Sequence, residues 1–472
     1  MCAHELKLKI SKAKAFDIGE IIDYLQNNFS FKFFYRKGSE KIRNYLYENG
    51  KYEYVSDYEF EAFIKEKVEE LTGAPFNKNK KLHEILELLK KTRKNINKDI
   101  NQLNADESVI NFKNGLLDLK TMELREHTPD VLSTIQLNAK YEGATPTPVF
   151  DSFLDDLTEK DKEKKQALLE YMGACFSNIN GYRFKKTLIL KGKGNTGKSV
   201  LRSVVDYILD DENTSSGSLA SLESRFGKFD LFEKRLFGSS DLGYMNVSQL
   251  ETFKSVTGGD NIQIEEKCKN SFSYRYKGLM WFGTNALPHF GGDRGDWVYE
   301  RMLIIECNNV ISKENRDSKL VEKIIKEASG IIYKALVALK EAIKRGYEFF
   351  EPNESQKIKE KYKVENSPYV QFANECLEKK ENNDRYTTGR VQVSLKNWCS
   401  ENFPSFKPNV TDFKRELKEH CYDMEIKKTN GNTFYKKITF NAKGKVYYTG
   451  THTNEEKYEE DEHESGILLN DF

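Results

Sequence analysis

The chain has 472 residues, of which 38% are apolar and 32% charged, and its 30 Phe, 25 Tyr and 3 Trp supply enough bulk for packed cores. No apolar run approaches the ~18 residues that cross a bilayer, and residues 1–16 lack the apolar centre of a secretory signal. The seven cysteines form no CxxC pair, which argues against a zinc site or a disulfide framework. We therefore expect a cytoplasmic protein of two or three domains with no membrane partner.

The net charge of +1 hides an uneven distribution of charge along the chain. Residues 454–472 carry eight acidic side chains against Lys457 alone, whereas residues 385–453 carry thirteen Lys and Arg against six Asp and Glu. A basic segment followed by an acidic, disordered tail is typical of a nucleic-acid surface with a solvated or self-masking end. The alternative is an ordinary protein with an acidic terminus.

Residues 1–150 predict a small α+β domain. Residues 18–38 favour a helix that runs into a strand, and residues 56–73 favour a helix with a Ser/Asp start and a Gly stop. The segment VINFKNGLLDLKTMEL, at 109–124, has Asn-Gly between two apolar runs and predicts a hairpin. The Pro- and Thr-rich segment 143–150 then predicts a linker.

Strands and helices alternate through residues 151–350, which predicts a three-layer α/β domain with a largely parallel sheet. Its strongest motif is an apolar strand at 187–190, followed by Lys191, GKGNTGKS and a helix. This satisfies G-x-x-x-x-G-K-[ST] in the required strand-to-helix context. The sequence therefore predicts a binding loop for ATP with Mg²⁺.

Each part of this loop has a chemical reason. The glycines let backbone N–H groups converge on phosphate oxygens, and the helix beginning near Lys198 presents its positive end. Lys198 supplies charge to the β- and γ-phosphates, and the Ser199 hydroxyl ligates Mg²⁺. The predicted loop comprises Gly192, Lys193, Gly194, Asn195, Thr196, Gly197, Lys198 and Ser199.

Two further strand ends carry polar side chains. The segment KRLFGSSD ends in Asp241, which would hold Mg²⁺ through water or polarise the attacking water. The segment GLMWFGTN ends in Asn285, which would contact the γ-phosphate and orient water. The alternative for both residues is an ordinary turn. Because Leu242 follows Asp241, no adjacent acid supplies a separate general base.

A basic hairpin and an arginine complete this region. The strands IQIEE and SFSYRY would flank a tip that contains Lys267 and Lys269. Arg301 precedes an apolar strand, where it would reach a neighbouring subunit's γ-phosphate. Arg294 is the less favoured candidate for that role, and the alternative for Arg301 is an ion pair with Glu300 or another nearby acid.

Residues 351–453 predict helices near 366–380, 391–402 and 409–420, followed by two short strands, which together suggest a winged-helix module. One helix would enter the major groove of duplex DNA and the wing would contact its backbone. Trp398 belongs in the core of this module. The alternative is a solvated basic face. The candidate DNA-binding residues here are Arg390, Lys414, Arg415, Lys427 and Lys428.

Together, GKGNTGKS, FGSSDLG, FKSVTGGDNIQ, MWFGTN and an Arg before an apolar strand resemble superfamily III helicases. The segments VINFKNGLLDLKTMELREHTP and YTTGRVQVSLKNWCSENF extend the resemblance to the phage/plasmid primase–helicase family, and within it to the replication initiators of pathogenicity islands and related cassettes. The resemblance implies an AAA+ P-loop ATPase core and a homo-hexameric ring that moves 3′ to 5′ on single-stranded DNA. Lys198, Asp241, Asn285 and Arg301 would be catalytic, and Lys267 and Lys269 would line the channel.

The sequence departs from this family in two respects. Many relatives have an acid pair where this chain has Asp241 and Leu242, and many carry a primase domain for which no DGD-like motif is found here. We therefore expect no primase activity, and a separate primase becomes a candidate partner. The leading hypothesis is a replicative helicase of a mobile element that binds origin duplex through residues 351–453. The alternatives are an origin-binding initiator that uses its ATPase as an assembly switch, and a different P-loop motor such as a packaging ATPase.

Overall fold

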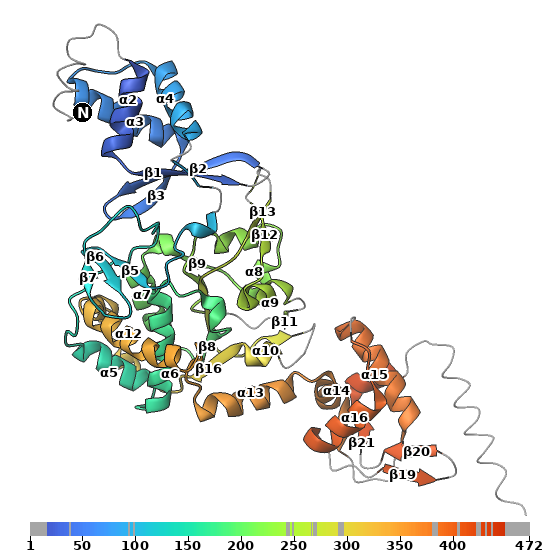
Figure 1. The fold of residues 1–472 in the computed structure, drawn as a ribbon. Helices are drawn as coiled ribbons and strands as arrows, with labels where there is room; N and C mark the ends of the chain where they lie inside the picture. The colour runs from blue at the N-terminus through green and yellow to red at the C-terminus, as the bar shows by residue number, and fades with distance from the viewer. Residues whose placement is uncertain are drawn as a thin grey trace, which may run out of the picture. The chain divides into compact units, whose positions relative to one another are not determined.

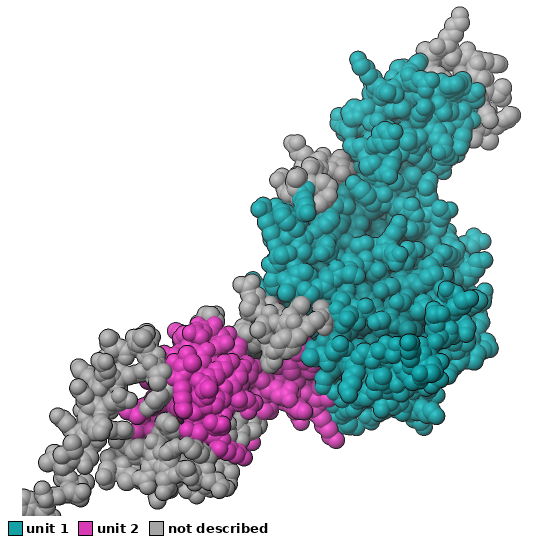
Figure 2. Space-filling model, turned by 180° about the vertical axis from the view of Figure 1, so that it is seen from behind, with its two compact units in different colours: residues 1–243, 251–286, 300–355 teal, residues 244–250, 287–299, 356–472 magenta. Residues whose placement is uncertain are grey.

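The chain folds into two compact units, which Figure 2 distinguishes by colour. The larger unit comprises residues 1–243, 251–286 and 300–355, and the smaller unit comprises residues 244–250, 287–299 and 356–472. The computed structural model describes residues 17–36, 39–92, 95–97, 100–241, 246–247, 250–265, 267, 271–290, 297–379, 386–403, 406–421, 426–429, 432–435 and 438–448. Lys269, Arg294 and the expected acidic tail lie outside the described residues.

The larger unit begins with an α+β domain, in which three helices cover one face of a four-stranded sheet (Figure 1). The helix predicted from residues 56–73 is confirmed, because Ser56 and Glu59 form a reciprocal capping box and Gly73 ends the helix at φ 69°. The strand order is β3-β2-β1-β4. The elements are α2 (Ile18–Asn28), β1 (Phe31–Arg36), β2 (Ser39–Glu48), β3 (Lys51–Val55), α3 (Asp57–Thr72), α4 (Asn79–Lys91), β4 (Ile96–Asn97) and the 3₁₀ turn η2 (Ile100–Gln102).

The predicted hairpin is present as β5 (Val109–Phe112) and β6 (Gly115–Asp118), with β7 (Leu124–Arg125) beside it. Its two-residue loop is Lys113-Asn114 and not Asn114-Gly115, because Phe112 pairs with Gly115. The Asn114 side chain bonds in both directions to the backbone of Tyr141. Gly115 is required for another reason, since a Cβ there would overlap the carbonyl oxygen of Arg125 on β7.

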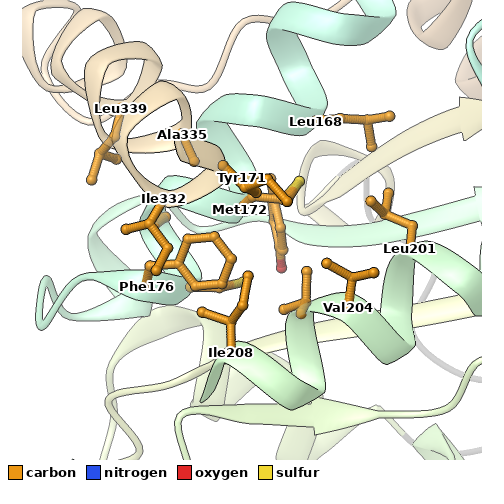
Figure 3. Close-up of a cluster of buried hydrophobic side chains, with 14 of the residues drawn as sticks. Leu168, Tyr171, Met172, Phe176, Leu201, Val204, Ile208, Ile332, Ala335 and Leu339 are labelled. Atoms are coloured by element: carbon orange, nitrogen blue, oxygen red, sulfur yellow. The ribbon is translucent and has the colours of Figure 1, made fainter. Parts of the chain in front are cut away.

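The main hydrophobic core runs across residue 150. It joins Phe112 and Leu117 of the hairpin to the helices α5 (Pro148–Leu157), α6 (Lys162–Phe176), α7 (Lys198–Leu209) and α12 (Ala328–Lys344). Figure 3 shows how side chains of α6, α7 and α12 interdigitate in this core. Helices α6 and α12 pack so closely that a Cβ at Gly173 would overlap the carbonyl oxygen of Ala335. The domain boundary at 150 stays a prediction, and the hairpin before it packs with the chain that follows.

Five parallel strands form the central sheet, in the order β16-β8-β14-β10-β9. The largely parallel α/β sheet predicted from the sequence is therefore confirmed. The strands are β8 (Thr187–Lys191), β9 (Thr214–Ser216), β10 (Leu236–Gly238), β14 (Leu279–Thr284) and β16 (Met302–Glu306). The remaining elements of this unit are η3 (Gly181–Arg183), η4 (Asp211–Asn213), α8 (Leu219–Leu222), η5 (Gly227–Leu231), α9 (Glu251–Gly258), β12 (Ile262–Ile264), β13 (Phe272–Tyr274), η6 (Lys313–Asn315) and α11 (Leu320–Ile325).

In the smaller unit, short strands and helices surround a core that contains Trp398 and Phe413, as expected for Trp398. A three-stranded sheet has the order β18-β20-β19, and β17 pairs with β21. The elements are β11 (Asn246–Val247), β15 (His289–Phe290), α10 (Trp297–Glu300), α13 (Asn353–Glu365), α14 (Pro368–Cys376), β17 (Leu377–Lys379), β18 (Tyr386–Thr387), α15 (Thr388–Asn402), α16 (Val410–Glu416), the π turn η7 (Leu417–Cys421), β19 (Ile426–Thr429), β20 (Asn432–Tyr435), β21 (Ile438–Phe440) and α17 (Ala442–Tyr448), of which α10 and α13 reach into the larger unit. Across the described parts of the chain, no helix is both long and apolar enough to cross a membrane.

Candidate functional site

Three parallel strands end at the same level of the central sheet. Lys191 pairs with Thr284 of β14 on one side and with Glu306 of β16 on the other. The predicted phosphate-binding loop, residues 192–199 and called the P-loop below, begins with Gly192, which donates its N–H to the Thr284 carbonyl at 3.0 Å. Cys307 donates its N–H to the Lys191 carbonyl at 2.8 Å. The loop therefore leaves β8 at the carboxyl edge of the sheet, where open α/β sheets bind ligands.

The shape of the P-loop explains two of its three glycines. A Cβ at Gly192 would overlap the carbonyl oxygen of Cys307, and Gly197 begins α7 in left-handed backbone at φ 95°. Asn195 also adopts a left-handed conformation, at φ 65°. Gly194 has open space where its Cβ would lie, so no protein atom requires a glycine there.

Lys198 lies at the centre of the loop. Its ammonium nitrogen donates to the carbonyl oxygens of Gly192 and Lys193, both at 2.7 Å, and its side chain is largely buried. Burial lowers the pKa of Lys198, while the nearby Cys307 and Asp241 oppose that shift. Gly197 offers no side chain to cap α7, so the first N–H groups of this helix point into the loop without a side-chain acceptor.

Asp241 is brought to the same edge by the chain that continues β10. The Gly283 N–H donates to the Ser239 carbonyl at 2.7 Å, and a Cβ at Gly283 would overlap the carbonyl of Ser240. Residues 239–240 therefore run beside the end of β14. Asp241 is exposed and lies close enough to Lys198 to act on its pKa.

Asn285 follows Thr284 directly, at the end of β14, and its side chain is exposed. Because β14 lies between β8 and β10, Asn285 stands between the P-loop strand and the strand that leads to Asp241. The sequence-predicted loop, acid and amide are thus assembled at one edge of the sheet. Their catalytic roles stay predictions.

Arg301 binds within its own chain. Its guanidinium donates to the Lys254 carbonyl and, at 2.7 Å, to the Thr257 hydroxyl, both near the end of α9. Burial lowers the pKa of Arg301, opposed by the charges of Asp260 and Glu300. The expected role as a finger toward another subunit stays a prediction.

The sequence motifs did not identify residues 309–311, which lie beside the P-loop. The Ile311 N–H donates to the Asn195 carbonyl at 2.9 Å, and the Asn309 amide donates to the Asp156 carbonyl at 3.0 Å. Val310, between them, is 47% exposed. Residues 309–311 therefore join the loop to the end of α5 and present an apolar surface there, a feature for which the sequence holds no motif.

The basic hairpin forms as predicted, with β12 and β13 antiparallel and Lys267 exposed in the connecting turn. Glu265, at the end of β12, accepts two hydrogen bonds from Arg225, at 2.9 and 2.7 Å. The neighbouring Phe226 is 36% exposed, with the Arg225 guanidinium 5.2 Å from its ring centroid. The sequence analysis did not identify this Arg-Phe pair, because the surrounding segment ESRFGKFDLF carries no motif.

The candidate duplex-binding residues are spread over three elements of the smaller unit. Arg390 lies on α15, and Lys414 and Arg415 lie on α16. Arg415 forms an ion pair with Asp412 at 3.0 Å. Lys427 and Lys428 lie on β19, which pairs antiparallel with β20, and their side chains are outside the described structure.

Two known families match separate parts of the chain. Residues 190–301 match a family of unknown function (DUF5906), and residues 30–159 match a family described as D5 N terminal like. The first match extends from the end of the P-loop strand to Arg301. The predicted phosphate loop, acid, hairpin and amide thus all lie within the residues that this one family model matches.

Similar proteins are known by sequence and by structure. The protein named "Putative helicase L207/L206", from Acanthamoeba polyphaga mimivirus, is 26% identical over 243 residues, which cover 47% of this chain and 24% of that protein. The chain thus spans about a quarter of that relative's length. The A form apo structure of the NrS-1 C-terminal region has a TM-score of 0.51 at 14% identity, over 89% of this chain and 99% of that one. This likeness shows a shared fold.

Proposed function

We propose that the chain is an ATP-dependent DNA helicase of the AAA+ superfamily III type, which moves 3′ to 5′ on single-stranded DNA as a homo-hexameric ring and initiates replication of a mobile element. One observation carries the proposal. The P-loop, Asp241 and Asn285 converge on one sheet edge, and the same unit presents Lys267 on a hairpin. The match to a D5 N-terminal-like family and the helicase name of the viral relative support it.

The edge of the sheet fits ATP with Mg²⁺. The uncapped start of α7 and the Lys198 ammonium offer positive charge to phosphate oxygens. When phosphate binds, the Lys198 ammonium would donate to it in place of the Gly192 and Lys193 carbonyls. Ser199 and Asp241 would hold Mg²⁺, which neutralises phosphate charge when bound. Asn285 would orient the attacking water.

The hairpin and its surroundings fit single-stranded nucleic acid. Lys267 offers a sequence-independent phosphate contact, and the exposed Phe226 ring offers a face on which a base stacks. Arg225 ties this ring to the base of the hairpin through Glu265. A winged-helix arrangement of α14–α16 and the β19–β20 pair would bind duplex origin DNA. A separate primase would supply primers.

The measurement that tests the proposal is strand displacement on forks with only a 3′ or only a 5′ single-stranded tail. Wild type should unwind from the 3′ tail with ATP and Mg²⁺, and Lys198→Ala should abolish it. Lys344 is an exposed lysine of α12 that pairs with Glu341. Lys344→Ala is therefore the matched control and should unwind normally. Unwinding that survives in Lys198→Ala would refute the proposal.

A second candidate is an origin-binding initiator whose ATPase serves as an assembly switch without processive unwinding. It is favoured by Asp241, which reaches the sheet edge with Leu242 and not a second acid after it. Intact ATP hydrolysis with no unwinding from either tail, and tight binding to one duplex sequence, would support this candidate instead.

A further inference from the structure

The β12–β13 hairpin has little stability of its own. Its strands are three residues long and pair only with each other among the described strands. An isolated two-stranded hairpin is marginally stable in water at best. Its inward-facing side chains, which include Phe272 and Tyr274, are nevertheless buried, so another part of the protein must cover them.

Phe232 covers the hairpin from the segment that follows η5. Its ring centroid lies 5.2 Å from that of Phe272 and 5.1 Å from that of Tyr274, at interplanar angles of 84° and 63°. These edge-to-face contacts are the favourable geometry for aromatic pairs. The position of β13 therefore depends on the residues that contact Phe232 from the other side.

Arg43, on β2 of the N-terminal sheet, holds Phe232. Its guanidinium carbon lies 4.4 Å from the Phe232 ring centroid and 5.0 Å from that of Tyr54. A guanidinium this close to aromatic rings is attracted by their electron-rich faces. The N-terminal sheet therefore lies against the segment that supports the hairpin. Figure 1 shows the hairpin strands β12 and β13 below β2.

A second connection runs in parallel through Glu233. The Tyr45 hydroxyl, also on β2, donates to the Glu233 carboxylate. The Glu233 N–H in turn donates to the Tyr274 hydroxyl on β13 at 3.2 Å. Glu233 has left-handed backbone, at φ 58°, a conformation that a non-glycine residue keeps only where its surroundings enforce it.

We propose that Arg43 and Tyr45 are positioning residues, through which the N-terminal sheet holds the β12–β13 hairpin in place for contact with DNA. This inference rests on the proposed function only for the hairpin's ligand. It gives the N-terminal domain a role that no sequence motif indicates. Two separate contacts from β2 end on β13, through Phe232 and through Glu233.

The same sheet offers a matched control. Lys51, on β3, forms an ion pair with Glu212 of η4 at 3.3 Å. That contact also joins the N-terminal sheet to the rest of the unit. The Glu212 backbone carbonyl accepts in turn from the Lys234 ammonium, so the connection does not run through the Phe232 ring or the Glu233 carboxylate. Lys51→Ala thus removes an ion pair between the N-terminal sheet and the rest of the unit, but leaves the contacts of Phe232 and Glu233 with β2 in place.

The test compares Arg43→Ala, Arg43→Lys and Lys51→Ala in the full chain by hydrogen–deuterium exchange and by ATP turnover with and without oligo-dT. Arg43→Ala should raise hydrogen–deuterium exchange in β12 and β13. It should also lower DNA-stimulated ATP turnover about tenfold, which corresponds to the loss of roughly 1.4 kcal/mol of contact free energy. Basal turnover should not change. Arg43→Lys keeps a positive charge and should show a smaller loss of DNA-stimulated turnover than Arg43→Ala. Lys51→Ala should match wild type in both exchange and turnover.

Unchanged exchange of β12 and β13 in Arg43→Ala would overturn the inference, as would an equal rise in Lys51→Ala. If Arg43→Ala fails to fold, Tyr45→Phe keeps the ring, removes one hydroxyl and should raise exchange at Tyr274. If wild type shows no DNA stimulation, the proposed function fails, and the exchange comparison still decides whether β2 supports the hairpin.

Discussion

At the scale of single residues, the same Gly→Ala substitution at two positions of the P-loop should change stability by different amounts. Gly192→Ala pushes a Cβ into the Cys307 carbonyl and should destabilise the fold by about 1–3 kcal/mol, as overpacking does. Gly194→Ala meets no protein atom, so its stability should stay within about 1 kcal/mol of wild type. Urea unfolding measures both.

Nucleotide affinity adds a second readout to this pair. If the loop wraps phosphate, Gly194→Ala should weaken ATP binding although it folds normally, because its Cβ points into space that the ligand would fill. Equal ATP affinity in Gly194→Ala and wild type would show that the loop does not close around phosphate at Gly194.

Glu233 predicts a pH dependence of stability. Burial raises the pKa of Glu233 above its ordinary value, against the opposing effects of Tyr45, Arg43 and Lys234, and the Tyr274 hydroxyl also faces its backbone. The folded chain therefore holds the proton more tightly than the unfolded chain. Stability contributed by Glu233 is present below the unfolded pKa of about 4.3 and is lost as pH rises through the raised folded pKa.

Glu233→Gln removes this titration and keeps an acceptor for the Tyr45 hydroxyl. Its melting temperature relative to wild type should therefore rise between pH 5 and pH 8. A constant difference across this range would mean that Glu233 does not change its protonation between these pH values, and would contradict the prediction.

The sequence predicted which residues meet at the carboxyl edge of the sheet, but not which residues surround them. Lys198, Asp241 and Asn285 each follow an apolar run, and parallel strands end at a common edge, so their convergence could be expected. Val310 and Glu233 carry no motif. Their surroundings arise from contacts between segments far apart in the chain, such as Tyr45 with Glu233, which a reading of local patterns does not supply.

At the scale of elements, the β12–β13 hairpin predicts a salt-dependent phenotype. Lys267 is exposed in its turn and contributes no described contact to the fold. If it contacts one phosphate, Lys267→Ala should lower the slope of log affinity for single-stranded DNA against log salt by about 0.7. Basal ATP turnover and nucleotide affinity should be unchanged.

Lys313, exposed on η6, is the matched control, and Lys313→Ala should keep the wild-type slope. A Lys267→Ala protein that loses ATP binding, and keeps its salt slope, would assign the hairpin to the nucleotide site and not to DNA.

Local signals predicted elements well where they were self-contained. The capping box and glycine stop of α3 involve residues within that helix, and both formed as expected. The hairpin turn at Lys113-Asn114 differed by one residue, because the Asn114 side chain is bound by Tyr141 and Gly115 is pressed against β7. Tertiary contacts that the local pattern does not contain set the register there.

At the scale of the whole molecule, composition locates a connecting segment but not the residues that pack against it. The Pro- and Thr-rich segment 143–150 resembles a linker in composition, yet Thr147 is buried and the core continues across it. Beyond 351, the Tyr362 hydroxyl donates to the Pro288 carbonyl and its ring contacts Tyr299 at 5.5 Å within the smaller unit. Composition marks where a chain turns, but packing decides which segments fold together.

Variants of Arg301 can test whether ATP turnover needs more than one copy of the chain. Its contacts with Lys254 and Thr257 hold α9 in the same chain, whereas the proposed ring needs it to act on a neighbour's nucleotide. Removing an arginine finger costs on the order of a thousandfold in turnover, so Arg301→Ala alone should be as inactive as Lys198→Ala. Loss of activity by itself does not separate the two roles.

Mixing the two inactive variants separates them. If Arg301 acts on a neighbour, an interface between an Arg301→Ala chain that keeps Lys198 and a Lys198→Ala chain that keeps Arg301 is complete. Random assembly of equal amounts makes roughly a quarter of all interfaces complete, so the mixture should recover activity that neither variant has. If Arg301 serves only to hold α9, the mixture stays inactive, and Arg301→Ala should show faster hydrogen exchange in α9 while Lys198→Ala does not.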